Sequence, residues 1–374
     1  MMKDKLRILN IGDLHLAHAS TPTEFIVRNL DRELSDEVLE SVDLLTVAGD
    51  VFDRLVGYNE PDIAIAEAWI TRLLYRCAAF NVVIRVVEGT PYHDRGQSDF
   101  FIRQKEMSDI PVDVKYFNTL DIEYIASLGI HMLYVPDKYN DDTSETLTEV
   151  KLLLKDRNLE KVDFALMHGA FEYQLPYIVE EPTHDSKAYL ELVRYLIFIG
   201  HVHISVEMDR ITPSGSFDRL AHGEEGEKGF HIADVDLATG NYKRMFYPNK
   251  QAMVYKTIEA HGVDANELWD IVDELVKEYP IGSNFALKIN KTDMIAKCIK
   301  EIEKTHRGYK WKFSIEKSKK DKTNEMRNAL AEGAIYLPPL TPSSMREAVK
   351  QRLTSKGLSD VEIEKALLLL DKEI

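Results

Sequence analysis

The sequence predicts an α/β protein in which a layered sheet flanked by helices is followed by a small α+β segment and a pair of terminal helices. Over the first 235 residues, short aliphatic runs alternate with segments of helical periodicity, which is typical of α/β sheets. This pattern changes from Tyr242 onward. Two more helical segments follow near the end of the sequence. A linker over 326–342, rich in Pro and Gly, separates them from the α+β segment.

Six aliphatic runs have the length and composition of buried strands. They span 6–11, 44–48, 82–87, 131–135, 164–167 and 196–199. Helical periodicity lies between several of them, notably over 25–42 and 63–79. In the second of these helices Ile65, Trp69 and Leu73 share one face. That face would either pack on the protein's own sheet or serve in self-association.

Residues 241–325 are predicted to form the small α+β domain. We expect helices over 264–278 and 292–305, and strands over 284–289 and 309–315. Between residues 297 and 322 there are ten Lys/Arg against four Asp/Glu. This basic stretch is either a solvated surface or one that contacts phosphates.

Residues 343–374 are predicted to form a helical hairpin, which the linker 326–342 joins to the preceding domain. Ser359 suits the N-cap of the second helix, because Glu362 stands at the capping-box position. The same helix ends in the apolar run 366–370. The hairpin would therefore dock on the chain's own body or bind a partner.

Bulk composition limits the kind of protein. The chain has 374 residues, of which 44% are hydrophobic, and this suits two or three domains with buried cores. Its two cysteines, Cys77 and Cys298, fit neither a disulfide framework nor a thiolate zinc site. Neither a membrane-spanning run nor a signal-peptide pattern is apparent, so we expect a cytoplasmic protein. The net charge of −16 argues against wrapping nucleic acid by bulk electrostatics.

Acidic and imidazole side chains follow the predicted strands where each one ends. The candidates are Asp13, His15, Asp50, His168, His201 and His203. Ligands gather at the carboxyl ends of strands in open α/β sheets, so we expect these side chains to lie together. A pair of divalent ions needs a bridging carboxylate and several terminal ligands, and Asp50 is the natural bridge. Mixed nitrogen and oxygen ligation suits manganese, iron or zinc better than calcium or magnesium.

The motifs follow one another in a recognisable order. The order is Asp-x-His at 13–15, Gly-Asp-x-x-Asp at 49–53, Gly…His-Asp at 89–94, a lone His at 168 and Gly-His-x-His at 200–203. In this order they resemble the calcineurin-like metallophosphoesterase superfamily. Within it, residues 13–16, 49–53 and above all 213–230 resemble the SbcD-type nuclease subunit of the double-strand-break repair complex. Ordinary phosphatases of the superfamily lack the stretch 213–230.

This resemblance implies a sheet sandwich with nuclease activity over 1–240 and a DNA-binding capping domain over 241–325. The hairpin 343–374 would bind an SbcC-type, SMC-like ATPase. The implied activity is manganese-dependent exonuclease and endonuclease cleavage at double- and single-stranded DNA ends, by a homodimer in a bacterial or phage-infected cell. The chain lacks a phosphate-gripping Gly-x-x-x-x-Gly-Lys-Ser/Thr loop, so ATP control would come from the partner.

The resemblance also assigns individual residues. One metal would be held by Asp13, His15, Asp50 and His203, and the other by Asp50, His168 and His201. Arg95, Gln97 and Arg219 flank the motifs, where they would contact DNA phosphates or belong to exposed polar loops.

The third motif departs from the family pattern. There it reads Gly-Asn-His-Asp or Gly-Asn-His-Glu, in which the Asn binds metal and the His is the catalytic acid. Here residues 89–94 read Gly-Thr-Pro-Tyr-His-Asp. His93 would protonate the leaving sugar oxygen, for which an imidazole is suited, and Asp94 would orient it. Thr90, Tyr92, a main-chain carbonyl or a water would replace the Asn, and we hypothesise weaker or partner-dependent binding of the second metal.

Two rival functions remain open from the sequence. The first is a phosphatase or cyclic-nucleotide phosphodiesterase that uses the same metals on small substrates, although the stretch 213–230 and the appended C-terminal regions disfavour it. The second is a nuclease-dead scaffold that positions DNA for its ATPase partner, as the altered third motif suggests. Retention of His93 favours an active enzyme over the scaffold.

Overall fold

The computed structural model describes residues 3–137, 142–175, 181–290 and 293–316, together with the single positions 350, 363 and 367. The chain divides into two compact units, Met1–Ser314 and Ile315–Ile374. The predicted linker 326–342 lies outside the described residues, and so does the predicted hairpin 343–374 apart from those single positions. Within the described ranges, no helix has both the length and the apolar character needed to cross a membrane.

The first sheet has six strands in the order β11-β10-β1-β2-β3-β4. Their bounds are β1 Lys5–Ile11, β2 Leu44–Val47, β3 Val83–Val87, β4 Val114–Phe117, β10 Gly229–Asp236 and β11 Tyr242–Pro248. β1 to β4 run parallel to one another, whereas β10 is antiparallel to both β1 and β11. The helices of this half are α1 Thr23–Glu33, α2 Asp36–Glu40, α3 Pro61–Phe80 and α4 Phe100–Met107, and a short 3-10 turn spans Gln97–Asp99.

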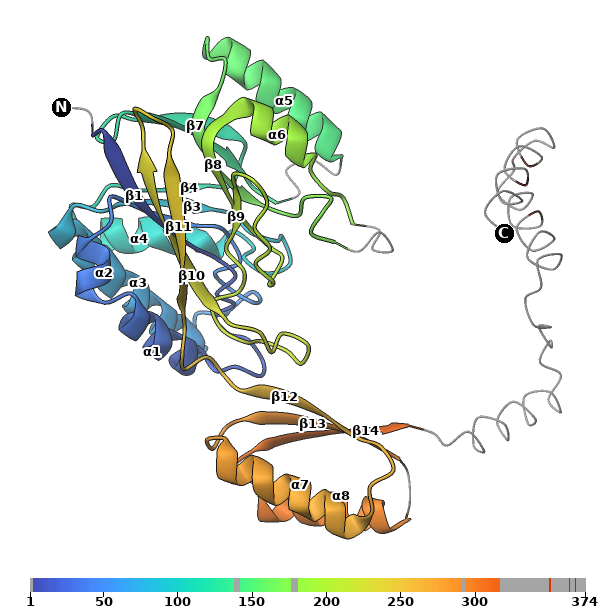
Figure 1. Cartoon of the computed structure of the whole chain (residues 1–374). Helices are drawn as coiled ribbons and strands as arrows, with labels where there is room; N and C mark the ends of the chain where they lie inside the picture. Colours follow the sequence, from blue (N-terminus) through green and yellow to red (C-terminus); the bar gives the residue numbers. More distant parts are fainter. Residues whose placement is uncertain are drawn as a thin grey trace. The chain divides into compact units, whose positions relative to one another are not determined.

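The second sheet has five strands in the order β5-β6-β7-β8-β9. Their bounds are β5 Asp121–Ile125, β6 Ile130–Val135, β7 Val162–His168, β8 Val193–Gly200 and β9 Ile211–Pro213. Strands β6 to β9 are parallel. Helices α5 Thr143–Asp156 and α6 Ser186–Leu192 lie together beside β7 and β8 (Figure 1).

The two sheets pack face to face, and the alternation of side chains along each strand explains how. On β1, Ile8 points into the core between the sheets, whereas its neighbour Leu9 joins the core beneath α1 to α4. On β7, Phe164 lies in the inter-sheet core and Ala165 packs with α5 and α6. The fold is therefore a sheet sandwich with helices on both outer faces, which confirms the predicted layered α/β class.

The six predicted strands are present as β1, β2, β3, β6, β7 and β8. The predicted helix 25–42 is instead two helices, because the chain leaves α1 at Leu34 and the Ser35 side chain caps α2 by accepting a hydrogen bond from the Val38 N–H. Trp69 and Leu73 are each only 2% exposed in the core beneath the first sheet. Ile65 is partly buried against the same core, so this face of α3 packs on the protein's own sheet, whereas self-association stays a prediction.

A third sheet has the order β12-β13-β14 and carries two helices. Its elements are β12 Tyr255–Ala260, α7 Ala265–Glu278, β13 Asn284–Asn290, α8 Asp293–Thr305 and β14 Lys310–Glu316. A capping box formed by Asp264 and Glu267 starts α7. The change of pattern predicted at Tyr242 falls within the first sheet, because β11 pairs with β10 there. The proposed capping role of 241–325 stays a prediction.

Candidate metal centre

The candidate ligands lie at one edge of the sandwich, because parallel strands deliver their carboxyl ends to the same side. From the first sheet, Asp13 and His15 follow β1 and Asp50 follows β2. From the second sheet, His168 ends β7, and His201 and His203 follow β8, which ends at Gly200. The site is therefore shared by the two sheets, and all six predicted ligands come together there.

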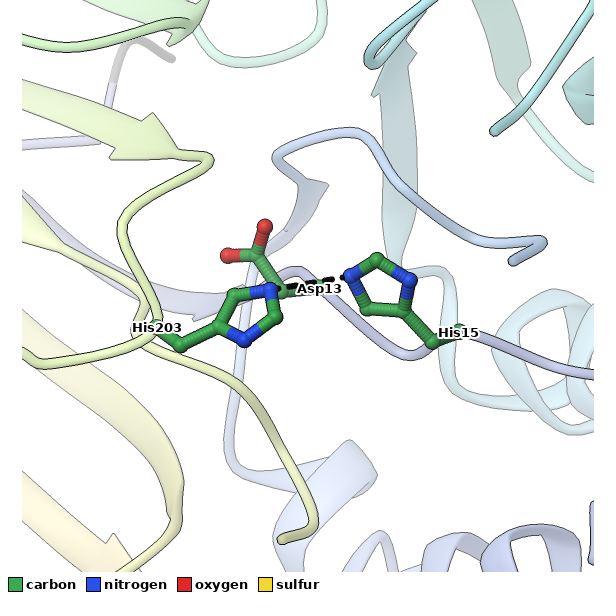
Figure 2. Close-up of side chains that lie close together, drawn as sticks. All are labelled: Asp13, His15 and His203. Carbon is green, nitrogen blue, oxygen red and sulfur yellow. Dashed lines mark hydrogen bonds between the residues drawn. The ribbon is translucent and has the colours of Figure 1, made fainter. Parts of the chain in front are cut away.

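The first cluster contains Asp13, His15 and His203, whose ligand atoms lie within 4.8 Å of one another. Figure 2 shows one ring nitrogen of His15 pointing toward one of His203, with the Asp13 carboxylate beside them. The Nε2 atoms of His15 and His203 are 3.0 Å apart. His15 Nε2 also lies 3.7 Å from Asp50 Oδ2, so this carboxylate reaches the first cluster.

The second cluster contains Asp50, His168 and His201. Asp50 Oδ2 lies 3.3 Å from His168 Nε2. Burial alone would raise the pKa of Asp50, but the imidazoles of His168, His15 and His93 outweigh this and hold it well below its usual range. Asp50 is a member of the second cluster and its Oδ2 lies 3.7 Å from His15 Nε2 of the first, so it lies between the two clusters; its role as a bridging ligand stays a prediction.

The outer nitrogen of each imidazole is hydrogen-bonded away from the clusters. His15 Nδ1 meets Asp53 Oδ1 at 3.0 Å, and His203 Nδ1 meets Glu224 Oε1 at 2.8 Å. His168 Nδ1 contacts the Ala48 carbonyl at 2.6 Å, and His201 Nε2 contacts Glu181 Oε1 at 2.8 Å. These partners only accept hydrogen bonds, so a neutral imidazole gives its single N–H to them and turns a lone pair toward the cluster.

That arrangement fits divalent cations. The Nε2 atoms of His15 and His203 are 3.0 Å apart, and if both outer nitrogens carry the N–H, their lone pairs meet there and need a proton or a metal ion beside them. Donor atoms that share an ion at about 2.1 Å lie about 3.0 to 3.4 Å apart, and both the His15–His203 and the Asp50–His168 separations fall in this range. Burial would lower the pKa of His168, yet the facing Asp50 carboxylate raises it well above normal, so the second cluster also favours positive charge.

Asp13 is held in place from two sides. Its Oδ1 accepts the His201 N–H at 2.8 Å, and its Oδ2 accepts the Ser214 hydroxyl at 2.9 Å. Four ligand residues have left-handed backbone conformations, with φ of 49° at Asp13, 50° at His15, 51° at Asp50 and 106° at His201. Non-glycine residues avoid this region, and such strain is concentrated at functional sites. Here it turns the side chains at the strand ends toward the two clusters.

His93 lies next to the first cluster, since it forms a group with His15 and Asp50 within 4.8 Å. Its Nδ1 contacts the Asp53 carbonyl at 2.6 Å, so Nε2 is the nitrogen that can meet a substrate. Asp94 does not orient it, contrary to our expectation. The Asp94 carboxylate is fully buried and instead accepts the N–H groups of Phe52 and Gly89, each at 2.9 Å. Burial, together with the charge of Asp50, raises its pKa to about 8.

The three predicted DNA contacts differ in their surroundings. Arg95 is exposed, and its Nε donates to the Tyr92 carbonyl. Gln97 is buried, and its amide bonds the Val56 N–H and the Arg54 carbonyl, which favours a structural role. Arg219 donates to the main-chain carbonyls of residues 226, 252 and 253. Of the three, Arg95 has the side chain best placed to reach a phosphate.

Some site residues were not identified from the sequence. Asp53 stands in the second motif without an assigned role, although it holds both His15 and His93. Glu224 lies in the discriminating stretch 213–230, which was the available signal for it. Glu181 has no such signal, because it reaches His201 from a loop with no motif of its own.

A largely buried set of carboxylates and imidazoles in two neighbouring candidate metal clusters is typical of the metal-dependent hydrolases. Residues 6–205 match the family described as calcineurin-like phosphoesterase, and the chain belongs to that family. Members bind divalent metal ions, in agreement with the two clusters.

Two solved structures have a weak overall similarity to this chain. TT1561 of Thermus thermophilus is 10% identical over 64% of this chain and 98% of its own, with a TM-score of 0.39. A glutamine-dependent NAD+ synthetase from Acinetobacter baumannii, in complex with ADP, is 13% identical over 94% of this chain and 72% of its own, with a TM-score of 0.32. The search of curated proteins gives no match.

Proposed function

We propose that this phosphoesterase is a DNA exonuclease and endonuclease of the SbcD type, acting in double-strand-break repair. The observation that supports the proposal is the location of residues 213–230 beside the first cluster. Ser214 holds Asp13, Glu224 holds His203, and buried Lys228 donates to the His203 carbonyl at 2.9 Å. Side chains of the stretch that resembles the SbcD-type subunit, and that ordinary phosphatases lack, therefore support the first metal cluster.

In this function a DNA phosphodiester lies across the two clusters. Bound divalent ions supply Lewis acidity there, because they lower the pKa of an attacking water and neutralise charge on the phosphoryl oxygens. His93 donates a proton from Nε2 to the leaving sugar oxygen, while the Asp53 carbonyl fixes the ring through Nδ1. Asp50 lies between the two clusters and would contact an ion in each. Glu224 is ionised for this task, since His203 and Lys228 outweigh burial and set its pKa at about 2.

The proposal extends to cofactor and partners. Manganese is the proposed ion, because it accepts both imidazole and carboxylate ligands. DNA ends are the proposed substrate, with the segment 241–325 as a binding surface. An SbcC-type ATPase is proposed to bind the hairpin 343–374. A homodimer would need a surface other than the buried residues Trp69 and Leu73.

The test is manganese-dependent digestion of end-labelled duplex DNA by the purified chain, with and without an SbcC-type ATPase. We expect cleavage that His93→Ala reduces by about 10²-fold or more. His131→Ala is the matched control, because the side chains of His131 and His93 are 34% and 35% exposed. Hydrolysis of small phosphoesters alone would support the phosphatase, and no cleavage of any substrate would support the scaffold.

A further inference from the structure

Thr90 takes up a position inside the second cluster. Its hydroxyl oxygen lies 3.1 Å from Asp50 Oδ2, 3.3 Å from His168 Nε2 and 3.3 Å from His201 Nδ1. These are the inner donor atoms of the cluster. The side chain is only 7% exposed, so the hydroxyl faces the cluster rather than solvent.

The local backbone explains this placement. A methyl group on Gly89 would lie 2.1 Å from the Asp50 nitrogen, so only glycine lets the chain approach this closely. The approach allows the Thr90 N–H to donate to Asp50 Oδ1 at 2.6 Å. With its main chain fixed by that bond, Thr90 presents its side chain to the other Asp50 oxygen and the two imidazoles.

The surroundings of the hydroxyl contain more acceptors than it can satisfy. A threonine hydroxyl has one proton to donate. Around it converge a carboxylate oxygen and two imidazole nitrogens whose other ring nitrogens are already bonded to Ala48 and Glu181. In the neutral form that binds metal both imidazoles offer a lone pair, so one hydrogen bond from Thr90 leaves two of the three acceptors unmatched, and a cation among the four atoms would match them all.

The separations also suit a shared ion. Neighbouring ligands at about 2.1 Å from one ion lie about 3.0 to 3.4 Å apart, and the three distances from Thr90 all fall in this range. The other candidates in the motif are placed differently. The Thr90 carbonyl already accepts the N–H groups of His93 and Asp94, and Tyr92 is 70% exposed.

We propose that the Thr90 hydroxyl is the fourth protein ligand of the second divalent cation, alongside Asp50, His168 and His201. A neutral hydroxyl oxygen is a hard donor of the kind that binds Mg²⁺ and Mn²⁺. The assignment rests on the metal centre proposed above, but not on DNA being the substrate.

An alternative role for Thr90 is to position Asp50 by a hydrogen bond without touching an ion. The two roles predict different results, because Asp50 is shared between the clusters. Loss of a positioning bond to a shared carboxylate weakens both ions together. Loss of a direct ligand weakens one ion and leaves the other close to its original affinity.

The experiment is calorimetric titration of the metal-free chain with manganese chloride, without any substrate. Wild-type protein is expected to bind two ions. Thr90→Val, which replaces the hydroxyl by a methyl of similar size, is expected to weaken one ion by at least about tenfold and leave the other within about twofold. Thr90→Ser, which keeps a hydroxyl, is expected to bind both ions. Thr46→Val is the matched control, because Thr46 is fully buried and its hydroxyl contacts the Leu9 carbonyl and the Asn10 side chain.

The outcomes test the metal centre and the Thr90 assignment separately. If wild-type protein binds no manganese, the metal centre itself is wrong. If it binds two ions and Thr90→Val does the same with unchanged affinities, only the Thr90 assignment is overturned, and equal weakening of both ions overturns it in favour of positioning. Thermal unfolding with EDTA checks that each variant is folded. Should Thr90→Val not fold, Thr90→Ala removes the hydroxyl without adding a methyl in its place and is read in the same way.

Discussion

Gly89→Ala is expected to disable the centre without removing a single ligand. The added methyl carbon would lie 2.1 Å from the Asp50 nitrogen and 2.3 Å from Asp50 Oδ1. Real Cβ contacts essentially never fall below 3.0 Å, so the two strand ends must move apart by about 0.9 Å. This movement displaces Asp50, the carboxylate on which both clusters depend.

A displacement of about 1 Å in a catalytic group costs about 10²-fold in rate. We therefore expect the kcat for manganese-dependent hydrolysis of bis(4-nitrophenyl) phosphate to fall about 100-fold in Gly89→Ala. Gly226→Ala is the matched control, since a methyl group there meets nothing within 4 Å, and its kcat should stay within about twofold of wild type. Circular dichroism establishes that both variants are folded. A folded Gly89→Ala protein with wild-type kcat would show that the approach of residue 89 to Asp50 is not essential.

Three further results are expected. Glu224→Gln removes the charge that holds His203 Nδ1, so calorimetry should show one manganese ion bound about 10- to 100-fold more weakly, and an unchanged titration would contradict that role. Manganese should raise the melting temperature, because an ion at about 100 times its dissociation constant adds about 2.7 kcal/mol to the free energy of unfolding, and identical melting curves with manganese and with EDTA would argue against the site. Glu123→Gln should lower the free energy of unfolding by about 2 kcal/mol at pH 7, because it weakens the charge-assisted hydrogen bonds to Arg85, which is 1% exposed and keeps its ion pair with Asp113. Burial opposes ionisation of Glu123, but its hydrogen bonds with Arg85 and Lys115 hold its pKa below normal, so the loss should shrink as pH falls through that pKa, and urea unfolding at pH 7 and pH 3 measures it.

The sequence was sufficient to predict which candidate ligands lie together, for a physical reason. Buried parallel strands are continuous aliphatic runs, and polar residues such as Asp50 and His168 are conspicuous where those runs stop. Because all the carboxyl ends meet at one edge, finding the strand ends also predicted that these residues lie together.

The sequence was insufficient where local geometry decides. Asp94 follows His93 directly, yet the turn directs its carboxylate to the N–H groups of Phe52 and Gly89. No residue pattern shows where that carboxylate will point. The position of Thr90 likewise depends on how closely the main chain at Gly89 approaches Asp50, a distance that only the folded backbone provides.

The predicted helix over 25–42 illustrates a further limit. Its apolar periodicity continues through the break, so the pattern alone reads as one helix. The helix breaks because the Ser35 hydroxyl accepts the Val38 N–H, and this cap starts a second helix, α2. Likewise, pairing of the returning strand β10 with β1 joins residues more than 200 positions apart, which periodicity does not reveal.

The sharing of the metal centre between two sheets has a consequence for the order of events in folding. Asp13 and His203 face the same cluster from opposite ends of the family domain, and Asp50 and His168 come from different sheets. Closing such long loops precedes any benefit from the ions, so a partly folded chain has no complete ligand set to offer. We therefore expect divalent cations to act late on the folding pathway, where they slow unfolding and leave the folding rate almost unchanged.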